Sequence, residues 1–295
     1  MRTGLVVLNY NDAERTIKLV RRAAEMHVLD AICVTDNAST DDSVPAIRQA
    51  FSGVEQVFLL ESPSNGGYAA GNNLGLRYLA EEQNCDILLI ANPDVIFTKE
   101  SIDEICHAFE RYPEYGALGP VMRNADGTIS SRPYLQIPGA WQGIGLCFYT
   151  YNRIYERLHP YVLRDDGNGI MAVDALQGSF WAVRRDTLIK AGYLDEGTFL
   201  FYEEMSFAMR IREKCPEYRE GLLVNSFYLH NHSATIRSVL SQMQTYRIYM
   251  QSKVYFETTY HGMRGVQKAL LRAAIAISTL EKRVLLYGTN QKADS

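Results

Sequence analysis

Two acidic segments of this 295-residue chain have the residue types and the surroundings that an active site requires. The first is Asn92-Pro93-Asp94, which follows an apolar run of strand length at residues 87–90. Such a run is typical of a strand buried on both faces of a parallel sheet, and open α/β sheets bind ligands at the carboxyl ends of their strands. We therefore predict that Asp94 is a functional acid at the rim of a sheet, with a plain strand-end turn as the alternative.

The second acidic segment, residues 199–204, places two adjacent carboxylates directly after four large apolar residues. A helix that begins near Tyr202 would hold Glu203 and Glu204 in its first turn, where the helix macrodipole favours anions and explains both without a function. In the functional interpretation, the apolar and aromatic surroundings raise the pKa of one carboxylate, which then serves as a general base.

A pair of histidines forms a third candidate group. His230 and His232 follow a predicted strand at residues 222–229. Because side chains at positions i and i+2 of a strand point to the same side, both imidazoles would approach one ligand together. An exposed pair of histidines without a function is the alternative interpretation.

These groups need a scaffold, and the first part of the chain predicts one. Apolar runs at residues 4–8, 31–34, 54–60 and 86–90 alternate with helical patterns. Alternating strands and helices favour an α/β fold with a mostly parallel sheet, right-handed crossovers and all loop tips at one edge. The polar loops after the first three strands should therefore meet the Asp94 segment at one rim.

Each of these loops has a chemical and a structural interpretation. Asp36, just past the second strand, either binds ribose hydroxyls or a base N–H, or caps the helix that follows. Residues 66–73 bring glycines to a helix N-terminus, where backbone N–H groups can approach a diphosphate. This loop lacks the lysine of a P-loop, so its spacing alone is a weak sign of phosphate binding.

The second half of the chain is less regular. Its predicted elements are a helix at residues 101–111, an irregular insertion over the site at 132–168, a strand at 173–183, and a short helix at 186–191. Beyond residue 241 the pattern is helical. We predict a catalytic domain at residues 1–238, made of halves 1–120 and 121–238, and a C-terminal helical extension at 239–295.

Composition narrows the classes of protein. A net charge of -4 and a pI near 5.9 argue against a general nucleic-acid binder, which needs a basic face. The five cysteines are scattered without a C-x-x-C pair, so we expect neither a disulfide framework nor a zinc site, and a reducing cytoplasm fits best. We expect no signal peptide and no membrane span.

A helical wheel of residues 262–283 separates basic from apolar side chains. Arg264, Lys268 and Arg272 recur on one side. The other side gathers Val266, Leu270, Ala273, Ile277 and Leu280. Such a helix either lies peripherally on the inner face of the cytoplasmic membrane, or packs its apolar side on the catalytic domain or on a second subunit of a homodimer. Leu271 and Ile275 fall on the basic side and blur the pattern.

In order and spacing, several segments together resemble the family 2 glycosyltransferases of the GT-A fold. Those of the first half are residues 6–11, 34–41, 65–73 and 92–95. Those of the second half, at residues 177–180, 184–186, 192–196 and 199–204, resemble the acceptor-side block of bacterial polysaccharide transferases, including rhamnosyltransferase-like members. The resemblance covers roughly residues 5–238.

The resemblance implies a role for each matching donor-side residue. Residues that would hold the nucleoside are Asn9, Asn11 and Asp36. Residues beside the sugar diphosphate would be Gly66, Gly67 and Asn72. Asp94 matches the last acid of the D-x-D metal motif of the family, whereas Asn92 stands where the first acid is usual and leaves fewer anionic ligands for a metal.

On the acceptor side, Glu203 and Glu204 fall where many relatives carry Glu-Asp, with the second residue as the base. His230 or His232 matches the histidine that closes the metal–diphosphate site. The aromatic wall on the acceptor side would comprise Phe199, Phe201, Trp181 and Tyr202, which would stack on sugar faces and exclude water.

The implied reaction moves a sugar from a UDP- or dTDP-linked donor, with dTDP-rhamnose as one candidate, to a glycan or lipid-linked glycan. Mg²⁺ or Mn²⁺ would offset the charge of the leaving diphosphate, and Glu204 would deprotonate the acceptor, giving inversion. Two other classes stay open. A sugar nucleotidyltransferase should carry a basic glycine-rich loop near its N-terminus, and a non-catalytic nucleotide- or glycan-binding module would tolerate the departures at Asn92 and Glu204.

Overall fold

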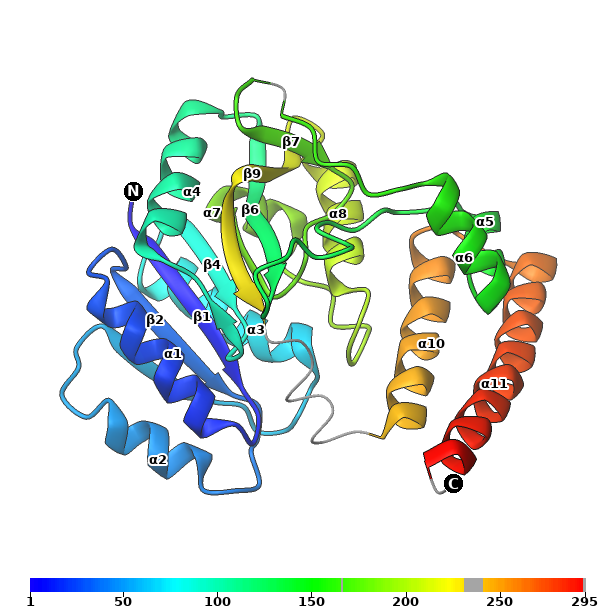
Figure 1. Cartoon of the computed structure of the whole chain (residues 1–295). Helices are drawn as coiled ribbons and strands as arrows, with labels where there is room; N and C mark the ends of the chain where they lie inside the picture. Colours follow the sequence, from blue (N-terminus) through cyan, green and yellow to red (C-terminus); the bar gives the residue numbers. More distant parts are fainter. Residues whose placement is uncertain (166, 231–240, 294–295) are drawn as a thin grey trace.

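Figure 1 shows the protein as a computed structural model, which describes residues 1–165, 167–230 and 241–293. Within these residues, nine strands form one sheet in the order β3-β2-β1-β4-β8-β6-β9-β5, with β7 paired to β9. The predicted α/β fold, a mostly parallel sheet flanked by helices with a helical C-terminal extension, is confirmed.

The first four strands pair in parallel, as their apolar runs predict. They are β1 (Thr3–Asn9), β2 (Ala31–Asp36), β3 (Val57–Glu61) and β4 (Ile87–Ala91). β1 lies between β2 and β4, and every residue of β2 and β4 is buried. Their carboxyl ends therefore lie at one edge, which is where the predicted polar loops begin.

Helices cover both faces of this sheet. One face packs against α1 (Ala13–Glu25), α2 (Ser43–Ala50) and α4 (Lys99–Arg111). The other packs against α3 (Tyr68–Arg77) with the π-helical turn η1 (Tyr78–Glu82), α7 (Arg185–Ala191) and α8 (Glu203–Lys214). The alternation of strand side chains explains both contacts, since Leu5 and Val7 of β1 face the first cluster and Val6 faces the second.

The second half of the chain extends the sheet with one parallel pair, β6 with β9, and several antiparallel pairs. Its strands are β5 (Val95–Ile96), β6 (Tyr115–Asn124), β7 (Ile170–Val173), β8 (Phe180–Arg184) and β9 (Arg219–His230). β8 runs antiparallel to both β4 and β6, and β5 and β7 run antiparallel to β9. The prediction of one strand at residues 173–183 is wrong, because residues 174–179 leave the sheet and separate β7 from β8.

The insertion at residues 132–168 also differs from its prediction. It contains α5 (Ala140–Gly145) and α6 (Tyr149–Leu158), and its described residues do not line the cavity that holds Asp94. Ala140, Ile144 and Phe148 instead pack against a small apolar cluster that includes Met263 and Leu271 of the C-terminal region. These three side chains thus serve this contact rather than a cover over the site.

The C-terminal extension consists of α10 (Gln242–Thr259) and α11 (Gly265–Ala293), which lie side by side at one edge of the molecule (Figure 1). α10 begins after Ser241 because of a capping box, in which Ser241 and Gln244 exchange side-chain-to-backbone hydrogen bonds. Nowhere in the described chain does a helix have both the length and the apolar content to cross a membrane.

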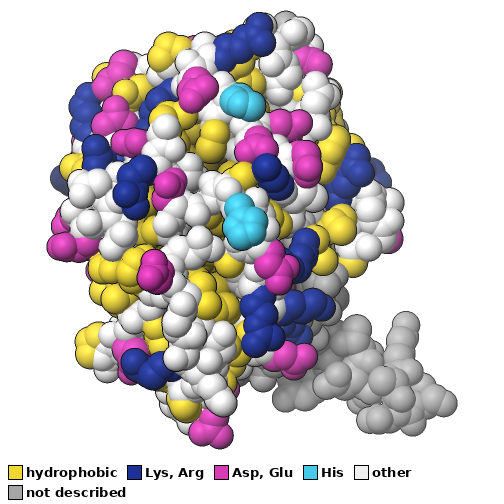
Figure 2. Space-filling view, turned by 90° about the vertical axis from the view of Figure 1, so that its left-hand side faces the viewer, with side chains coloured by type: hydrophobic (Ala, Val, Ile, Leu, Met, Phe, Trp, Pro, Cys, Tyr) yellow, Lys and Arg dark blue, Asp and Glu magenta, His cyan; other side chains and the backbone are white. Residues whose placement is uncertain are grey.

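Figure 2 shows the face on the opposite side of the molecule from α11. Acidic and basic side chains are interspersed on this face, with hydrophobic side chains scattered among them. Mixed signs of charge are usual for the solvated surface of a globular protein.

Candidate active site

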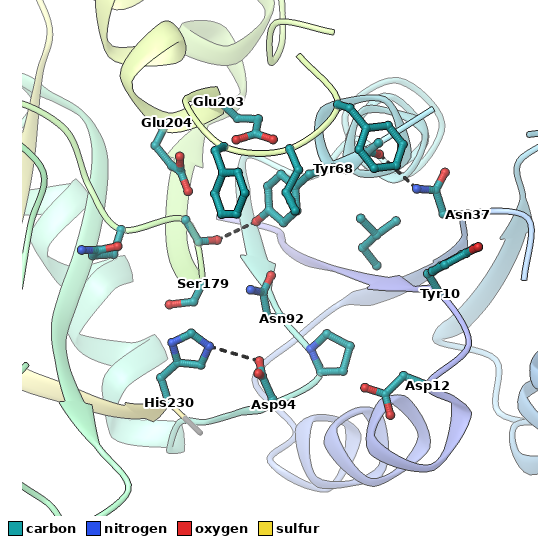
Figure 3. A pocket seen from close by; sticks show the side chains of 18 of the residues that line it. Tyr10, Asp12, Asn37, Tyr68, Asn92, Asp94, Ser179, Glu203, Glu204 and His230 are labelled. Carbon is teal, nitrogen blue, oxygen red and sulfur yellow. Dashed lines mark hydrogen bonds and ion pairs between the residues drawn. The ribbon is translucent and has the colours of Figure 1, made fainter. Parts of the chain in front are cut away.

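A cavity of about 500 Å³ opens at the edge of the sheet where the strand ends gather (Figure 3). The loops after β1, β2, β3 and β4 line one part of it, and the segments before β8 and α8 line another. Segments that are far apart in the sequence therefore line one cavity, and the predicted convergence of the polar loops at one rim is confirmed.

Asp94 and His230 meet on one side of the cavity. The short strand β5 pairs Val95 with His230, which sets the preceding Asp94 beside the imidazole. His230 Nε2 lies 3.2 Å from Asp94 Oδ1, and both side chains are largely buried. His232, the other predicted histidine, lies outside the described residues.

This pair of side chains fits a divalent cation only when a substrate completes the coordination. Among the residues that the structure describes, no three His, Cys, Asp or Glu side chains gather as metal ligands. Asp94 and His230 offer one carboxylate and one imidazole, with Asn92 also lining the cavity. Mg²⁺ and Mn²⁺ sites of this kind take one or two protein ligands and fill the remaining positions with phosphate oxygens and water.

The two glutamates lie on the opposite side of the cavity in Figure 3. α8 begins at Glu203, as predicted, so both carboxylates lie at the positive end of a helix. Glu203 is only 2% exposed, and its Oε1 atom has no hydrogen-bond partner among the described residues. Burial, and after it the charge of Glu204, raise the pKa of Glu203 well above its usual range.

Burial also raises the pKa of the neighbouring Glu204. Backbone N–H groups lower the pKa of both acids, those of Glu204 itself and Gly178 at Glu204, and those of Glu203 itself and Phe201 at Glu203. Because the charge of Glu204 acts on Glu203 in addition to burial, the neutral form is favoured more strongly at Glu203 than at Glu204. Two adjacent acids whose surroundings separate their pKa values can divide the roles of proton holder and base.

The loop that carries Gly178 is fixed from several sides. Tyr68 donates a hydrogen bond to the Gly178 carbonyl at 2.6 Å, and the Asn92 N–H donates to the Ser179 carbonyl at 2.9 Å. Burial raises the pKa of Tyr68 well above its usual range, which keeps its phenol available as a donor. The sequence analysis did not assign a role to Tyr68 or Gly178, although both lie in segments that carry the family resemblance.

Glu220 on β9 also holds this loop, which comprises residues 174–179. Its Oε2 atom accepts the Leu176 N–H at 2.8 Å, and the residue is only 5% exposed on β9. Burial raises the pKa of Glu220 to about 8. This bond holds the backbone of the loop at Leu176 against β9.

The predicted nucleoside residues form a network behind the cavity wall. Asn9 and Asp36 are neighbours in the register of β1 and β2, and Asn9 Nδ2 donates to Asp36 Oδ2 at 2.7 Å. Ser39 also donates to Asp36, and the Asn11 N–H donates to Ser39. The residues of these two loops that line the cavity are Tyr10, Asp12 and Asn37.

The glycine loop contributes through Gly67, which lines the cavity with a φ of 90°. Asn37 fixes this loop by donating to the Gly67 carbonyl at 3.0 Å and to Asn65 at 2.9 Å. Gly66 lies beside the lining, and Asn72 is fully buried, with its amide donating to the Tyr68 carbonyl. Asn72 therefore fixes the first turn of α3.

Trp181 and Tyr202, which were predicted on the acceptor side, do not line the cavity. Trp181 is 4% exposed in the core, opposite Ile90 on β4 and against the ring of Phe207. Tyr202 is 6% exposed and points toward α10, where its hydroxyl lies 3.3 Å from that of Tyr249. The apolar pattern of a strand does not show which of its aromatic side chains face the core and which face a cavity.

The aromatic wall is formed instead by residues 199–201, and α10 holds this segment in a strained shape. Phe201 and Tyr202 both have a φ of 73°, which is costly for bulky residues. Ser252 of α10 donates to the Leu200 carbonyl at 2.7 Å, and the ring of Tyr249 packs edge-on against that of Phe201. The C-terminal extension therefore takes part in shaping the cavity.

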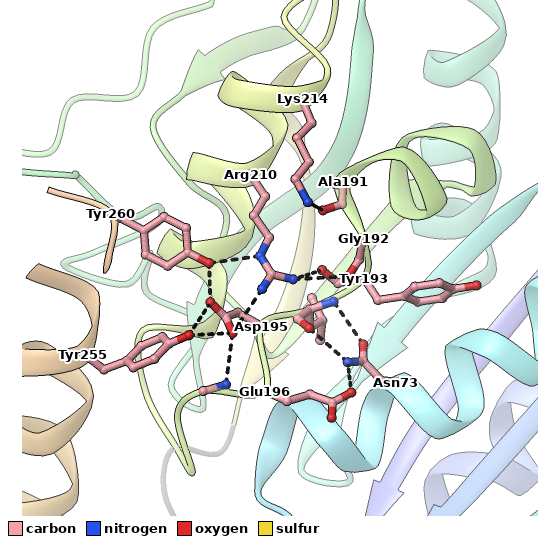
Figure 4. A network of polar contacts seen from close by, with 12 residues as sticks. Asn73, Ala191, Gly192, Tyr193, Asp195, Glu196, Arg210, Lys214, Tyr255 and Tyr260 are labelled. Carbon is pink, nitrogen blue, oxygen red and sulfur yellow. Dashed lines mark hydrogen bonds and ion pairs between the residues drawn. The ribbon is translucent and has the colours of Figure 1, made fainter. Parts of the chain in front are cut away.

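The buried carboxylate of Asp195 holds the turn that precedes residues 199–201 (Figure 4). Asp195 is 4% exposed, and it pairs with Arg210 of α8 at 3.1 Å. Tyr255 and Tyr260, from α10 and its C-terminal end, both donate to Asp195. Asn73 of α3 exchanges two hydrogen bonds with the backbone of residue 194. Three helices thus converge on the turn that leads into the cavity wall.

Comparison with known proteins places the chain among enzymes. Residues 5–188 match the family described as "Glycosyl transferase family 2". The chain is 26% identical to the "Low-salt glycan biosynthesis hexosyltransferase Agl10" of Haloferax volcanii, over 82% of this chain and 71% of that protein. It is 30% identical to the "N-acetylglucosaminyl-diphospho-decaprenol L-rhamnosyltransferase" of Mycobacterium tuberculosis, over 67% of this chain and 65% of that protein.

The fold is also found among solved structures. The mannosyltransferase PcManGT from Pyrobaculum calidifontis, in complex with GDP-Man and Mn²⁺, matches with a TM-score of 0.55 at 16% identity. The match covers 100% of this chain and 81% of that one, so the C-terminal helices are included in it. At this level of identity the comparison shows a shared fold.

Proposed function

This chain belongs to glycosyl transferase family 2, and we propose that it transfers a sugar from a nucleotide-diphosphate donor to a glycan or lipid-linked glycan, with inversion at the anomeric carbon. It is a glycosyltransferase of the GT-A fold, with relatives in glycan biosynthesis. The observation that carries the finer proposal is the acid pair at the start of α8, which lies across one cavity from Asp94 and His230.

The acid pair supplies the base. Glu204 accepts the proton of the acceptor hydroxyl as the acceptor oxygen bonds to the anomeric carbon. The bond from that carbon to the diphosphate oxygen breaks, and the nucleoside diphosphate leaves with the electron pair. Attack on the face opposite the leaving group gives inversion. Glu203 stays protonated because an ionised carboxylate at that buried position would be desolvated and would repel Glu204.

The other side of the cavity receives the diphosphate. Asp94 and His230 would hold a divalent cation together with phosphate oxygens of the donor. Such a cation offsets the negative charge that develops on the leaving group. The 3.2 Å contact between Asp94 Oδ1 and His230 Nε2 sets the two side chains side by side, so that both could face one cation.

The cavity wall limits the competing reaction with water. Phe199, Leu200 and Phe201 present apolar side chains beside the two glutamates. Rings of this kind stack on sugar faces and reduce the access of water to the anomeric carbon. Tyr10 and Asn37 line the part of the cavity near β1 and β2, where the nucleoside would bind.

The donor and acceptor are the finer part of the proposal. A UDP- or dTDP-linked sugar fits the family resemblance, and dTDP-rhamnose is the first donor to test because of the mycobacterial relative. The acceptor to test with it is a lipid-linked N-acetylglucosaminyl diphosphate. UDP-N-acetylglucosamine and GDP-mannose serve as competing donors.

The test measures release of nucleoside diphosphate and formation of the glycoside with and without Mn²⁺, and the anomeric configuration of the product. Glu204→Gln keeps the volume but removes the proton acceptor, so kcat should fall about 10²- to 10⁴-fold with little change in donor affinity. Glu203→Gln is the matched control and should cost far less, because the native side chain already carries its proton.

Three outcomes would contradict the proposal. A larger loss in Glu203→Gln than in Glu204→Gln would transfer the role of base to Glu203. A product with retained configuration would exclude the single displacement. If the protein turns over none of these nucleotide sugars, with or without acceptor, then the assignment of a nucleotide-diphosphate sugar as the donor is wrong.

A further inference from the structure

α11 packs on the protein through one side only. Leu271 is fully buried and Ala274 is 4% exposed, and both lie in the apolar cluster shared with α5. Ser278, also buried, accepts a 2.8 Å hydrogen bond from Tyr246 of α10. Ile275 packs against the same cluster. Leu271 and Ile275, which blur the amphipathic pattern of the sequence, are therefore the residues that attach the helix to the domain.

The apolar side predicted from the helical wheel faces away from the protein. Val266 is 74% exposed, Leu270 45%, Ile277 51% and Leu280 60%. With Ala273 they form one line along the helix, which we call the α11 stripe: Val266, Leu270, Ala273, Ile277 and Leu280. The prediction that this side packs on the catalytic domain is wrong, and α11 lies at the outer edge of the molecule (Figure 1).

The charged residues of α11 are mostly basic, unlike those of the chain as a whole. Lys268 and Arg272 lie on the side of the helix away from the stripe, because residues at i and i+2 of a helix point about 200° apart. Charged residues between positions 264 and 283 are Arg264, Lys268, Arg272, Glu281, Lys282 and Arg283, so five of six are basic, whereas the net charge of the chain is -4. Trp141, 63% exposed, extends from α5, which packs against α11.

We propose that the α11 stripe docks on the surface of a lipid bilayer that contains anionic lipids. Apolar residues along one side enter the boundary of the acyl chains, basic residues on the polar side of the helix are attracted by anionic headgroups, and an exposed tryptophan is typical of that interface. A symmetric dimer through the same stripe would instead bring two net basic helices together, which opposes association.

Docking would also place the catalytic cavity close to a lipid-linked acceptor. α10 packs beside α11 and holds the carbonyl of Leu200 in the cavity wall through Ser252. The two helices thus connect the membrane surface to the wall that would receive the acceptor. The docking itself does not depend on the proposed reaction, because it involves neither the donor nor the acceptor.

The test is flotation of the full chain with vesicles of phosphatidylglycerol and phosphatidylcholine in equal parts, compared with vesicles of phosphatidylcholine alone. We expect binding to the anionic vesicles and its loss at high salt. Ile277→Glu should weaken binding about 10- to 100-fold, the effect of losing one buried isoleucine. Lys268→Gln and Arg272→Gln should each weaken binding about 5-fold.

Ile189→Glu is the matched control, because Ile189 lies on α7 with 49% exposure, close to the 51% of Ile277, and gains the same charge. It should bind like the unmodified chain. Circular dichroism and thermal melting verify that every variant is folded, which is expected for changes at exposed positions. These measurements need no sugar donor, so failure of the transfer assay leaves them unaffected.

Two results would overturn the proposal. One is absence of binding to anionic vesicles by the folded, unmodified chain. The other is equal binding by Ile277→Glu and Ile189→Glu. If light scattering shows an oligomer that dissociates only in Ile277→Glu, while neither vesicle is bound, the stripe is covered by a second copy of this chain instead.

Discussion

Replacement of Glu220 by glutamine should make the protein more stable at neutral pH. Glu220 is buried on β9 and accepts the Leu176 N–H at 2.8 Å, and burial raises its pKa from the ordinary value of 4.5 to about 8. Glutamine has nearly the same shape and keeps a carbonyl oxygen for the Leu176 N–H. It has no proton to release, so the pH dependence that the carboxyl contributes to folding disappears in the variant.

The sign and size of the effect follow from proton linkage. Below pH 4.5 both the folded and the unfolded protein hold the proton, and Glu220 adds no pH dependence. Between pH 4.5 and 8 the unfolded chain releases the proton while the folded protein retains it, so each pH unit lowers the stability of the native protein by about 1.4 kcal/mol. The variant escapes this loss, which reaches about 3 kcal/mol at pH 7 and about 5 kcal/mol above pH 8.

The assay is urea unfolding of the native protein and of Glu220→Gln at several pH values from 4.5 to 8.5. The extra N–H of the amide changes the difference in free energy of unfolding between the two proteins by an amount that does not depend on pH. The increase of this difference with pH is therefore the quantity that tests the reasoning. Glu55→Gln, at an exposed position, gives the baseline for losing one surface carboxyl. A stability difference between native protein and Glu220→Gln that does not grow with pH would refute this reasoning.

Two further changes test the cavity itself. Asp94→Ala should abolish transfer at any Mn²⁺ concentration while thermal melting shows an intact fold, because Asp94 lies at a strand end rather than in the apolar core; full activity would contradict its assigned role. Gly178→Ala should lower kcat about 10²-fold with little change in stability, since the added Cβ would lie 1.9 Å from Glu204 Oε1 and the flexible carboxylate must move away. Unchanged turnover in Gly178→Ala would show that the position of this carboxylate does not limit the reaction.

The sequence alone was sufficient for features with a local physical cause. Buried strands appear as uninterrupted apolar runs, so the alternation of strands and helices, the shared edge of the loops and the rim position of Asp94 could all be predicted. Helix starts have local signals as well, which is why Glu203 was expected in the first turn of α8 and a helix was expected after Ser241. These predictions needed only periodicity, capping and the geometry of parallel sheets.

Other features depended on contacts between distant parts of the chain. The pairing of β5 with β9 brings His230 to Asp94, and the packing around α8 buries Glu203 and raises its pKa. Neither effect leaves a local pattern, because burial and strand pairing depend on what the rest of the chain places nearby.

The same limit explains the predictions that were wrong. An aromatic residue in a strand is apolar whether it faces a cavity or a core, so the burial of Trp181 could not be read from its type. The helical wheel of α11 identified an apolar side and two residues that blurred it, but Leu271 and Ile275 turned out to be the packed side. Hydrophobic periodicity shows that a helix has an apolar side, and only the tertiary structure shows what covers it.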